Sequence, residues 1–473
     1  MFKKDTIAAI ATGLTDSGIG IIRISGPEAV MVGDRLFRLS SGKKVLADMP
    51  SHLLQYGFVV DGEDDDSSWK EHILDEVMAV VMRAPKSFTG EETVEIHCHG
   101  GLLVLQKVLE CTIRNGARLA EPGEFTKRAF LNGKMDLAKA EAVIDLIHSQ
   151  NEFAHKSAVN QLKGLLSDQV KLLRSEILYE LAFIEAALDD PEHISLEGYS
   201  EKLTKKVEEI IYRLQKLIDS ADNGKLMKEG ISTVIVGKPN AGKSSLLNAL
   251  LGVDRAIVTD IAGTTRDVLE ETIRLKGISL NIIDTAGIRN TEDVVEKIGV
   301  EKAKKFAGDA DLIVYVVDAS VYLDESDREI IPLIKDKKAI VLLNKTDLVQ
   351  KVKEEELEAL LQEQGCVETK VIRTSITEHI GLEELEETIK DMFFRGQINI
   401  NHEVVITNLR HKEALMEALE SMKMVKRSAE DEMPEDFYSI DLMSAYAALG
   451  HIIGEEVDDD LVQEIFSKFC MGK

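Results

Sequence analysis

Cysteines and long apolar runs are scarce in this chain of 473 residues. The four cysteines, Cys98, Cys111, Cys366 and Cys470, lie far apart and show no metal-ligand spacing. Such sparse cysteines give no sign of a disulfide framework and fit a reducing cytoplasm. No apolar run is long enough to span a bilayer, and residues 1–12 are only mildly apolar. We therefore expect a cytoplasmic location, no contact with a membrane and no signal peptide.

Positively charged residues are also few relative to negatively charged ones. Lysine and arginine total 57 against 84 aspartates and glutamates, so the formal net charge is −27. An acidic surface of this kind repels RNA. The composition argues against a protein that coats RNA by itself, and an RNA substrate would need local basic patches or a partner protein.

One segment predicts a phosphate-binding loop. Residues 237–244 read Gly-Lys-Pro-Asn-Ala-Gly-Lys-Ser, with an apolar strand pattern before them and a helical pattern after them. The glycines let backbone N–H groups point at phosphate oxygens, and the helix N-terminus adds partial positive charge. Lys243 can reach the β- and γ-phosphates, and the Ser244 hydroxyl can ligate Mg²⁺. The predicted nucleotide-binding residues here are Asn240, Ala241, Gly242, Lys243, Ser244 and Ser245.

Two later segments predict that the base is guanine. Asn344, Lys345 and Asp347 belong to an Asn-Lys-Thr-Asp run that follows an apolar strand pattern, at the strand end where ligands of open α/β sheets bind. The Asp347 carboxylate can accept from N1–H and the exocyclic amine of guanine, a donor pair that adenine lacks. The stem of Lys345 can lie over the base, while Thr374 and Ser375 match a weaker guanine loop.

Two further segments predict the groups that sense the γ-phosphate. Asp284, Thr285, Ala286 and Gly287 end an apolar run, so that Asp284 would hold Mg²⁺ through water and the Gly287 N–H would contact the γ-phosphate. Thr265, in the run Gly-Thr-Thr-Arg-Asp, offers the second hydroxyl to Mg²⁺. Each segment alone reads as an ordinary turn, but all four motifs in this order predict a GTP site.

The residue after Gly287 is Ile288, where many GTPases carry a glutamine that orients water. Isoleucine can neither orient water nor stabilise charge. Asn240 can help to hold a monovalent cation against the phosphates, which would replace an arginine finger. The alternatives are that Asn240 only shapes the loop and that Glu296, in a helical stretch, is simply solvated.

The spacing of apolar residues predicts a multidomain chain, α/β plus all-α. Short β-rich runs predict a small α/β domain over residues 1–121, and the alternation over 223–394 predicts an inserted, doubly wound Ras-like GTPase domain. Residues 122–222 and 395–473 have helical spacing and would pack together as one helical domain. The alternative is two independent helical domains.

These motifs resemble the potassium-activated TrmE-Era-EngA-like GTPases, and the flanking segments resemble the MnmE (TrmE) family of tRNA wobble-uridine modification GTPases. The flanking segments are residues 18–26, 87–91, 99–101, 122–125, 128–134 and 469–473. The resemblance covers essentially the whole chain.

The resemblance implies a GTP site that continues through the segment 259–265 and a bound K⁺ ion. The additional GTP-binding residues are Thr259, Asp260, Ile261, Ala262, Gly263, Thr264 and Thr265. The K⁺ ligands would be Asn240, Thr259, Ile261 and Thr264, with Ser244 and Thr265 on Mg²⁺. Glu296 would then orient the attacking water.

The resemblance also implies a folate and two kinds of partner. Arg23, Glu95, Lys134 and Lys473 would surround a reduced folate, formyl- or methylene-tetrahydrofolate. The Cys470 thiolate would activate the pyrimidine, unless it is a small buried hydrophobe. The chain would form a homodimer through its N-terminal domains and a heterotetramer with the flavoprotein MnmG. Together they would place a carboxymethylaminomethyl-type group on carbon 5 of the wobble uridine of certain tRNAs.

Two other functions share some of these features. A ribosome-assembly GTPase switch has the same phosphate-loop motifs but would carry a basic RNA-binding domain, whereas this chain has helices and an acidic balance. The second is a folate-dependent enzyme whose nucleotide domain is only regulatory.

Overall fold

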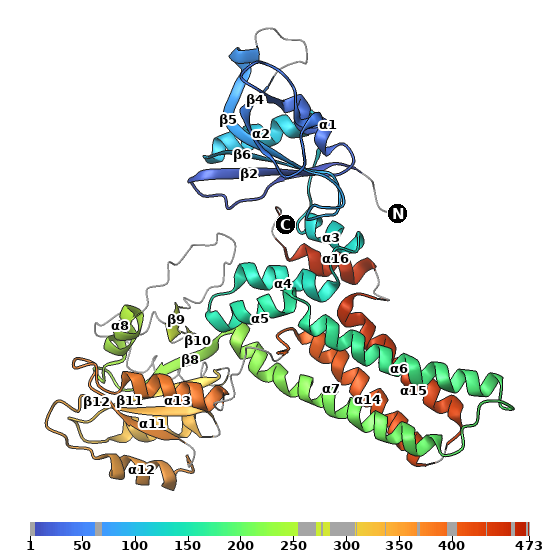
Figure 1. Cartoon of the computed structure of the whole chain (residues 1–473). Helices are drawn as coiled ribbons and strands as arrows, with labels where there is room; N and C mark the ends of the chain where they lie inside the picture. The colour runs from blue at the N-terminus through green and yellow to red at the C-terminus, as the bar shows by residue number, and fades with distance from the viewer. Residues whose placement is uncertain are drawn as a thin grey trace. The chain divides into compact units, whose positions relative to one another are not determined.

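The chain forms two compact units in a computed structural model. Unit 1 comprises Met1–Ile144, Gln161–Tyr179 and Tyr446–Lys473, and unit 2 comprises Asp145–Asn160 and Glu180–Ala445. The structure describes residues 5–61, 69–253, 271–275, 278–283, 308, 310–335, 337–366, 369–394, 404–431, 433–455, 459–469 and 472. Figure 1 labels the helices and strands along the chain.

Unit 1 contains a seven-stranded sheet with the order β3-β4-β5-β6-β2-β1-β7. Its strands are β1 (Ile7–Ile10), β2 (Ser17–Ser25), β3 (Phe37–Arg38), β4 (Leu54–Val60), β5 (Ile73–Met82), β6 (Thr93–Gly100) and β7 (Arg118–Leu119). Neighbouring strands are antiparallel except β1 and β7. Helices α1 (Ala29–Leu36) and α2 (Leu102–Arg114) cover one face.

The opposite face of this sheet carries polar and apolar side chains that remain accessible. Residues alternate between the two faces of a strand, so Ile96 of β6 is buried in the core while Glu95 is only partly buried. On β4 and β5, Leu54, Tyr56 and Met78 are large apolar side chains that stay exposed. One face of the sheet is therefore a helix-covered core. The other is open over β4 and β5, whereas on β1 Ile7 and Ala9 are buried against Phe125.

The end of the chain packs against an early helix in unit 1. Helix α3 (Glu124–Leu131) contacts α16 (Asp459–Ser467), and the rings of Phe130 and Phe466 lie 6.3 Å apart. Phe469 joins the same apolar cluster. This packing brings residues from the two ends of the sequence together.

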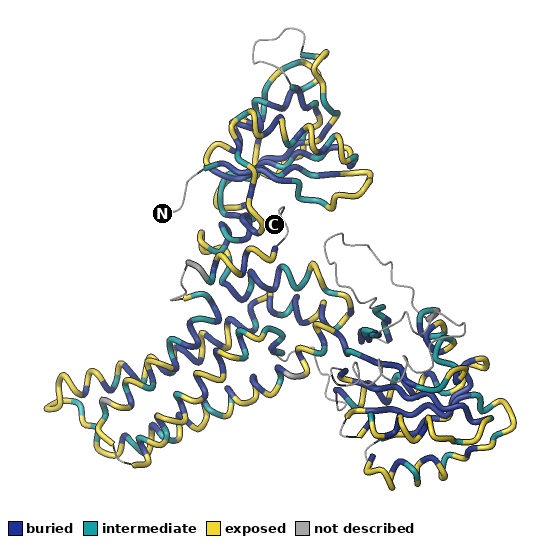
Figure 2. Tube along the Cα trace, turned by 180° about the vertical axis from the view of Figure 1, so that it is seen from behind, coloured by how far each residue is buried: buried dark blue, intermediate teal, exposed yellow. Residues whose placement is uncertain are grey.

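Unit 2 contains a six-stranded sheet with the order β13-β12-β11-β8-β10-β9. Its strands are β8 (Ile231–Val236), β9 (Glu271–Leu275), β10 (Ile278–Ile282), β11 (Leu312–Asp318), β12 (Ala339–Asn344) and β13 (Lys370–Arg373). All pairs are parallel except β9 with β10. Every residue of β11 and β12 is buried, as Figure 2 shows for the middle of this sheet. Strands buried on both faces read as continuous apolar runs, which explains their sequences.

Helices follow these strands or lie beside them. Among the described residues, α8 (Lys243–Val253), α11 (Glu325–Ile334) and α12 (Glu354–Glu363) lie between strands in the sequence, and α13 (Leu382–Phe394) follows β13. The all-helical segments are α4 (Leu137–His148), α5 (Glu152–Leu162), α6 (Leu165–Asp189), α7 (Tyr199–Glu229), α14 (Leu409–Glu430) and α15 (Glu435–Ile453).

The two long helices α7 and α14 pack along each other in unit 2. Five buried residues of α7 recur at alternate spacings of four and three, the period of a helix with one apolar face. They are Leu203, Val207, Ile210, Leu214 and Leu217. Packing therefore joins segments that lie before and after the six-stranded sheet in the sequence.

The predicted fold class is confirmed, with two α/β sheets and a set of long helices in one chain. Of the helices built from described residues, none combines the length and apolar character needed to cross a membrane.

Candidate functional site

The phosphate loop joins β8 to α8, as the motif requires. Gly242 has a φ of 109°, and a Cβ atom there would lie 2.2 Å from the Asn344 side-chain nitrogen. Only glycine tolerates both this backbone conformation and so close a neighbour. Asn240 has a φ of 62° and is exposed, which fits a residue type that enters the left-handed region readily.

Lys243 turns back over the loop that precedes it. Its Nζ donates to the carbonyl oxygens of Gly237 at 2.8 Å and Lys238 at 2.7 Å. Burial lowers the pKa of the Lys243 ammonium, because removal from water disfavours the charged form. A lysine held in this position can donate to phosphate oxygens that enter the loop.

Asn344 ties the predicted base-binding segment to the phosphate loop. It ends β12, is almost fully buried, and donates from Nδ2 to the carbonyl of Ala241 at 2.9 Å. Its Oδ1 accepts a hydrogen bond from the Thr374 hydroxyl at 3.3 Å. One side chain thus holds three loops at the carboxyl edge of the sheet.

Asp347 lies beside the second predicted guanine segment. Its Oδ1 accepts from the Ser375 hydroxyl at 2.7 Å, and the Thr346 N–H donates to the Thr374 carbonyl at 3.2 Å. Asp347 itself is exposed, whereas Thr374 and Ser375 are buried. The Asp347 carboxylate is therefore accessible, and the hydrogen bond from the buried Ser375 hydroxyl orients it.

Asp318 is a residue of this site that the sequence reasoning missed. Its Oδ2 lies 2.6 Å from the Lys345 Nζ, and its Oδ1 accepts from both the N–H and the hydroxyl of Ser320. Burial alone would raise the pKa of Asp318, but Lys345 and Ser320 outweigh it and lower that pKa. The signal was present, since Asp318 ends a buried strand at the same sheet edge as Asn344.

Several predicted GTP-site residues lie outside the described residues. They are Thr259, Asp260, Ile261, Ala262, Gly263, Thr264, Thr265, Asp284, Thr285, Ala286, Gly287 and Glu296. Within the part of the chain that the structure describes, no group of three or more His, Cys, Asp or Glu side chains is arranged to hold a metal. Of the predicted Mg²⁺ ligands, Ser244 is described and lies in the first turn of α8.

Two of the predicted folate-binding residues meet on the open face of the unit 1 sheet. Arg23 and Glu95 are register partners on β2 and β6, and the Arg23 Nε lies 2.8 Å from the Glu95 Oε1. The Arg23 guanidinium lies 5.7 Å from the ring centroids of both Phe88 and Phe125. It also donates to the carbonyl of Gly472 at 3.3 Å. A cation, a carboxylate and two aromatic rings are thus gathered near the end of the chain.

The other predicted folate and pyrimidine residues are placed only in part. The Lys134 Nζ donates to the carbonyl of Pro85 at 2.9 Å, at the loop that also carries Phe88. Cys470 and Lys473 lie outside the described residues. Gly472 is buried, and a Cβ atom there would lie 2.4 Å from the Ile10 carbonyl oxygen. Gly472 therefore lies against the end of β1.

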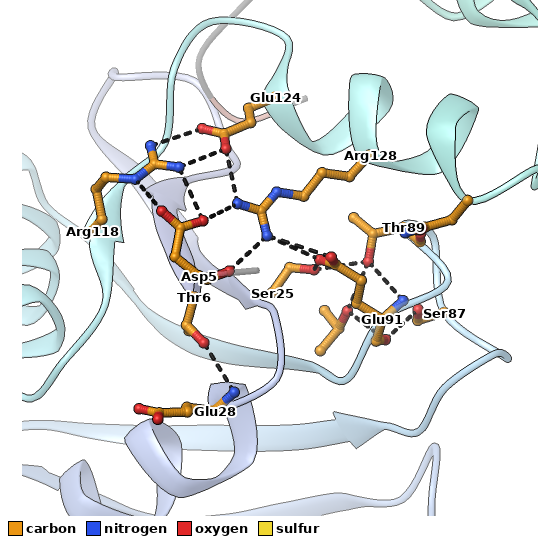
Figure 3. Close-up of polar contacts among 12 residues, drawn as sticks. Asp5, Thr6, Ser25, Glu28, Ser87, Thr89, Glu91, Arg118, Glu124 and Arg128 are labelled. Carbon is orange, nitrogen blue, oxygen red and sulfur yellow. Dashed lines mark hydrogen bonds and ion pairs between the residues drawn. The ribbon is translucent and has the colours of Figure 1, made fainter. Parts of the chain in front are cut away.

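A buried ion network lies at the start of α3, in the same unit (Figure 3). The Arg128 guanidinium is 2% exposed and lies 2.7 Å from Asp5, 2.9 Å from Glu124 and 3.2 Å from Glu91. Arg118 contacts Asp5 and Glu124 as well. The network holds α3, whose residue Phe125 faces Arg23, against the sheet.

The arginines lower the pKa of two carboxylates in this network. The hydrogen bond from Arg118 is the main cause for Asp5. Burial alone would raise the pKa of Glu124, but the hydrogen bonds from Arg118, the Glu121 N–H and Arg128 lower it overall. Sequence reasoning grouped Arg128 with a motif but assigned it no role, because two of its partners, Asp5 and Glu91, are distant in the chain.

Comparisons with known proteins match nearly the whole chain. A family described as "MnmE helical domain" matches residues 137–470, and one described as "GTP-binding protein TrmE N-terminus" matches residues 6–134. The chain is 56% identical over 471 residues to the tRNA modification GTPase MnmE of Lachnoclostridium phytofermentans, with 100% of both chains covered. It is 48% identical over 473 residues to proteins of that name from Acetivibrio thermocellus and Clostridioides difficile, again with 100% of each chain covered.

Proposed function

The chain belongs to the MnmE family of tRNA modification GTPases, and on this premise we propose which of its residues carry the activity. GTP is held by the phosphate loop 237–244 and by Asn344, Lys345, Asp347, Thr374 and Ser375. The main support for this assignment is the hydrogen bond from Asn344 to the Ala241 carbonyl, because it joins the base-binding segment to the phosphate loop. Asp347 reads the guanine edge, Lys243 contacts the phosphates, and Ser244 ligates Mg²⁺.

Modified-nucleoside analysis tests this function directly. A strain that lacks the gene should lose the modification at carbon 5 of the wobble uridine. The natural gene should restore it, and a gene carrying Lys243→Ala should not. Unchanged nucleosides in the deletion strain would contradict the role in tRNA modification and return attention to a ribosome-assembly switch.

Hydrolysis depends on K⁺ in this proposal. Asn240 supports it. Its backbone is left-handed, its side chain is exposed, and its amide oxygen is a suitable cation ligand. Thr259, Ile261 and Thr264 complete the ion site, Thr265 joins Ser244 on Mg²⁺, and Glu296 orients the water. The cation supplies charge near the phosphates, where an arginine finger acts in other GTPases.

The test compares GTP turnover in K⁺ and Na⁺ buffers of equal ionic strength. The natural chain should be much faster in K⁺, and Asn240→Ala should remove most of that difference. Asn248→Ala is the control, because Asn248 is an exposed asparagine on the adjoining helix α8. Equal rates of the natural chain in the two buffers would reject activation by K⁺.

A reduced folate, formyl- or methylene-tetrahydrofolate, binds at Arg23, Glu95, Lys134 and Lys473 in this proposal. The partly accessible Arg23–Glu95 pair, whose side chains are 15% and 16% exposed, supports it, because a cation suits the folate glutamate and a carboxylate suits the pterin donors. Equilibrium dialysis with formyl-tetrahydrofolate should show weaker binding for Arg23→Gln. Arg83→Gln should bind normally, because Arg83 pairs with Glu92 elsewhere in the unit. Equal affinity of both variants would reject the site.

Two copies of the chain pair through the open face of the seven-stranded sheet. Leu54, Tyr56 and Met78 support this, because their exposed apolar area would be removed from water in a dimer. Tyr56→Lys should shift the sedimentation coefficient toward that of a monomer, while Tyr179→Lys, an exposed tyrosine on α6, should not. A natural chain that sediments as a monomer would reject the pairing.

The remaining chemistry belongs to a complex with the flavoprotein MnmG, as a heterotetramer that receives the tRNA. The net charge of −27 supports a shared tRNA site, because this chain alone repels RNA over most of its surface. Cys470 acts as the nucleophile toward the pyrimidine. The domain division is 1–121, 122–222, 223–394 and 395–473, which the packing of α7 on α14 supports.

A further inference from the structure

Lys238, the second residue of the phosphate loop, is anchored on a helix that contributes nothing to the guanine segments. Its Nζ lies 2.7 Å from the Asp327 Oδ2 and 3.0 Å from the Asp324 Oδ2. Both carboxylates belong to the start of α11, with Asp324 as its N-cap and Asp327 in its first turn. The Lys238 side chain is 14% exposed and Asp327 only 1%, so this ion pair is largely removed from water.

Asp327 is itself held in place by two more donors. The hydroxyl of Tyr315, a fully buried residue of β11, donates to its Oδ1 at 2.7 Å, and the Asp324 N–H donates to its Oδ2 at 2.9 Å. A buried carboxylate is stable only when its lone pairs are satisfied, and here three groups satisfy them. The anchor is therefore rigid, unlike an exposed ion pair between two flexible side chains.

The backbone of Lys238 connects this anchor to the phosphate-contacting lysine. Its carbonyl oxygen accepts from the Lys243 Nζ at 2.7 Å, while its own ammonium is fixed on Asp327. Pro239 and Asn240 follow directly in the chain. The Asp327 carboxylate of α11 thus helps to fix the path of the first half of the loop, residues 237–240.

We propose that Asp327 is a positioning residue for nucleotide binding, which acts by holding Lys238 and with it the first half of the phosphate loop. This inference rests on the proposed assignment of residues 237–244 as the phosphate-binding loop. A pre-organised loop loses less conformational freedom when it binds a ligand, so the anchor strengthens binding without touching the phosphates. The effect is expected for both GDP and GTP, because both carry the β-phosphate that Lys243 can reach.

The experiment measures affinity for fluorescent GDP and for a non-hydrolysable GTP analogue, using the full-length chain. Lys238→Met should weaken both by about tenfold, and Lys238→Arg should stay close to the natural value. The turnover number at saturating GTP in K⁺ should fall as well, because Asn240, the proposed K⁺ ligand, lies in the same half of the loop. Arg328→Met is the matched control, because Arg328 is an exposed cation at the next position of α11.

A double variant separates positioning from stability. Lys238→Met leaves the buried Asp327 charge unpaired and should lower the melting temperature. Lys238→Met combined with Asp327→Asn should recover that temperature, because no unpaired charge remains, but should not recover the affinity. Recovery of both would show that the pair is only structural and would overturn the inference.

Lys243→Ala distinguishes failure of this inference from failure of the assigned site. If Lys243→Ala abolishes binding while Lys238→Met binds as the natural chain does, the positioning role is wrong and the phosphate loop stands. If Lys243→Ala binds nucleotide normally, the assignment of the loop is wrong and the inference falls with it.

Discussion

At the predicted guanine site, two accessible side chains are each held in place by a more buried neighbour. Asp347 is exposed, yet the buried Ser375 hydroxyl orients one of its oxygens. Lys345 is held by Asp318, whose pKa is lowered although burial opposes that change. Because Asp318 stays ionised, Lys345 keeps a fixed partner over a wide pH range.

Replacing Asp347 with Asn should exchange the preferred base. An amide offers one acceptor and one donor, so it cannot accept both guanine donors, but it can donate to the extra oxygen of xanthine. We expect GTP affinity to fall by about 100-fold or more and xanthosine triphosphate to become the better ligand. Competition against fluorescent GDP measures this, with Asp391→Asn on α13 as an exposed control. Undiminished GTP affinity would show that the base lies elsewhere.

Replacing Asp318 with Ala should weaken GTP and GDP by about threefold to tenfold, because Lys345 loses the partner that holds it. The same titration measures the loss. Asp311→Ala is the control, since Asp311 accepts from the Ser232 N–H at the far end of the same sheet. A loss of equal size in the control would mean that the site responds only to general damage.

Whole elements meet through a few close approaches. Asn151, just before α5, donates to the Met227 carbonyl at the end of α7 and to the Ser279 hydroxyl on β10. It thereby connects a helix to the strand that leads toward residue 284. The helix α7 also approaches the segment before α14 at Gly224, where a Cβ atom would lie 1.9 Å from the Ile406 carbonyl oxygen.

Gly224→Ala should therefore destabilise the protein. In an uncrowded helix the change to alanine would stabilise by up to ~1 kcal/mol, whereas overpacking here should cost about 1–3 kcal/mol. Denaturant unfolding followed by circular dichroism measures the sign. Asn223→Ala, at the exposed neighbouring position, should be neutral or stabilising. A more stable Gly224→Ala variant would contradict the close packing of α7.

Across the whole molecule, acidic residues outnumber basic ones, yet two of the arginines are placed in one cluster of carboxylates. The surplus of acidic residues is large, but Arg128 and Arg118 are committed to a buried cluster of carboxylates in unit 1. The folded pKa values of Asp5 and Glu124 lie below their ordinary values of 3.8 and 4.5. Their stabilisation is therefore fully present above about pH 4.5 and is lost as the pH falls through the lowered folded values.

Arg128→Met should remove stability, whereas part of the acid dependence should remain because Arg118 still contacts Asp5 and Glu124. Breaking a buried ion network by removing one partner destabilises by about 3–5 kcal/mol. Fluorescence of Trp69, the one tryptophan of the chain and a residue of unit 1, follows the unfolding at pH 7 and at lower pH. Arg83→Met, which removes a more exposed ion pair, is the control. An Arg128→Met variant as stable as the natural chain would contradict the role of the network.

Much of the nucleotide site was predictable because its motifs are short and local. The loop at 237–244 needs glycine at defined backbone angles, and the buried strands β8, β11 and β12 appear as continuous apolar runs. Short or mixed elements such as α1, β4 and β7 were not predicted, because they contain too few residues for a periodic spacing of apolar side chains to be recognised.

Local sequence patterns identify the residues that can curl around a phosphate and the strand ends that carry guanine-binding groups, since each depends on neighbours a few positions away. Three contacts arise from folding alone: Asp318 with Lys345, Asp327 with Lys238, and Arg128 with Asp5. These partners are 27 to 123 positions apart in the chain, and their charges matter because packing takes them out of water. Separation and burial of this kind leave no periodic trace in a sequence.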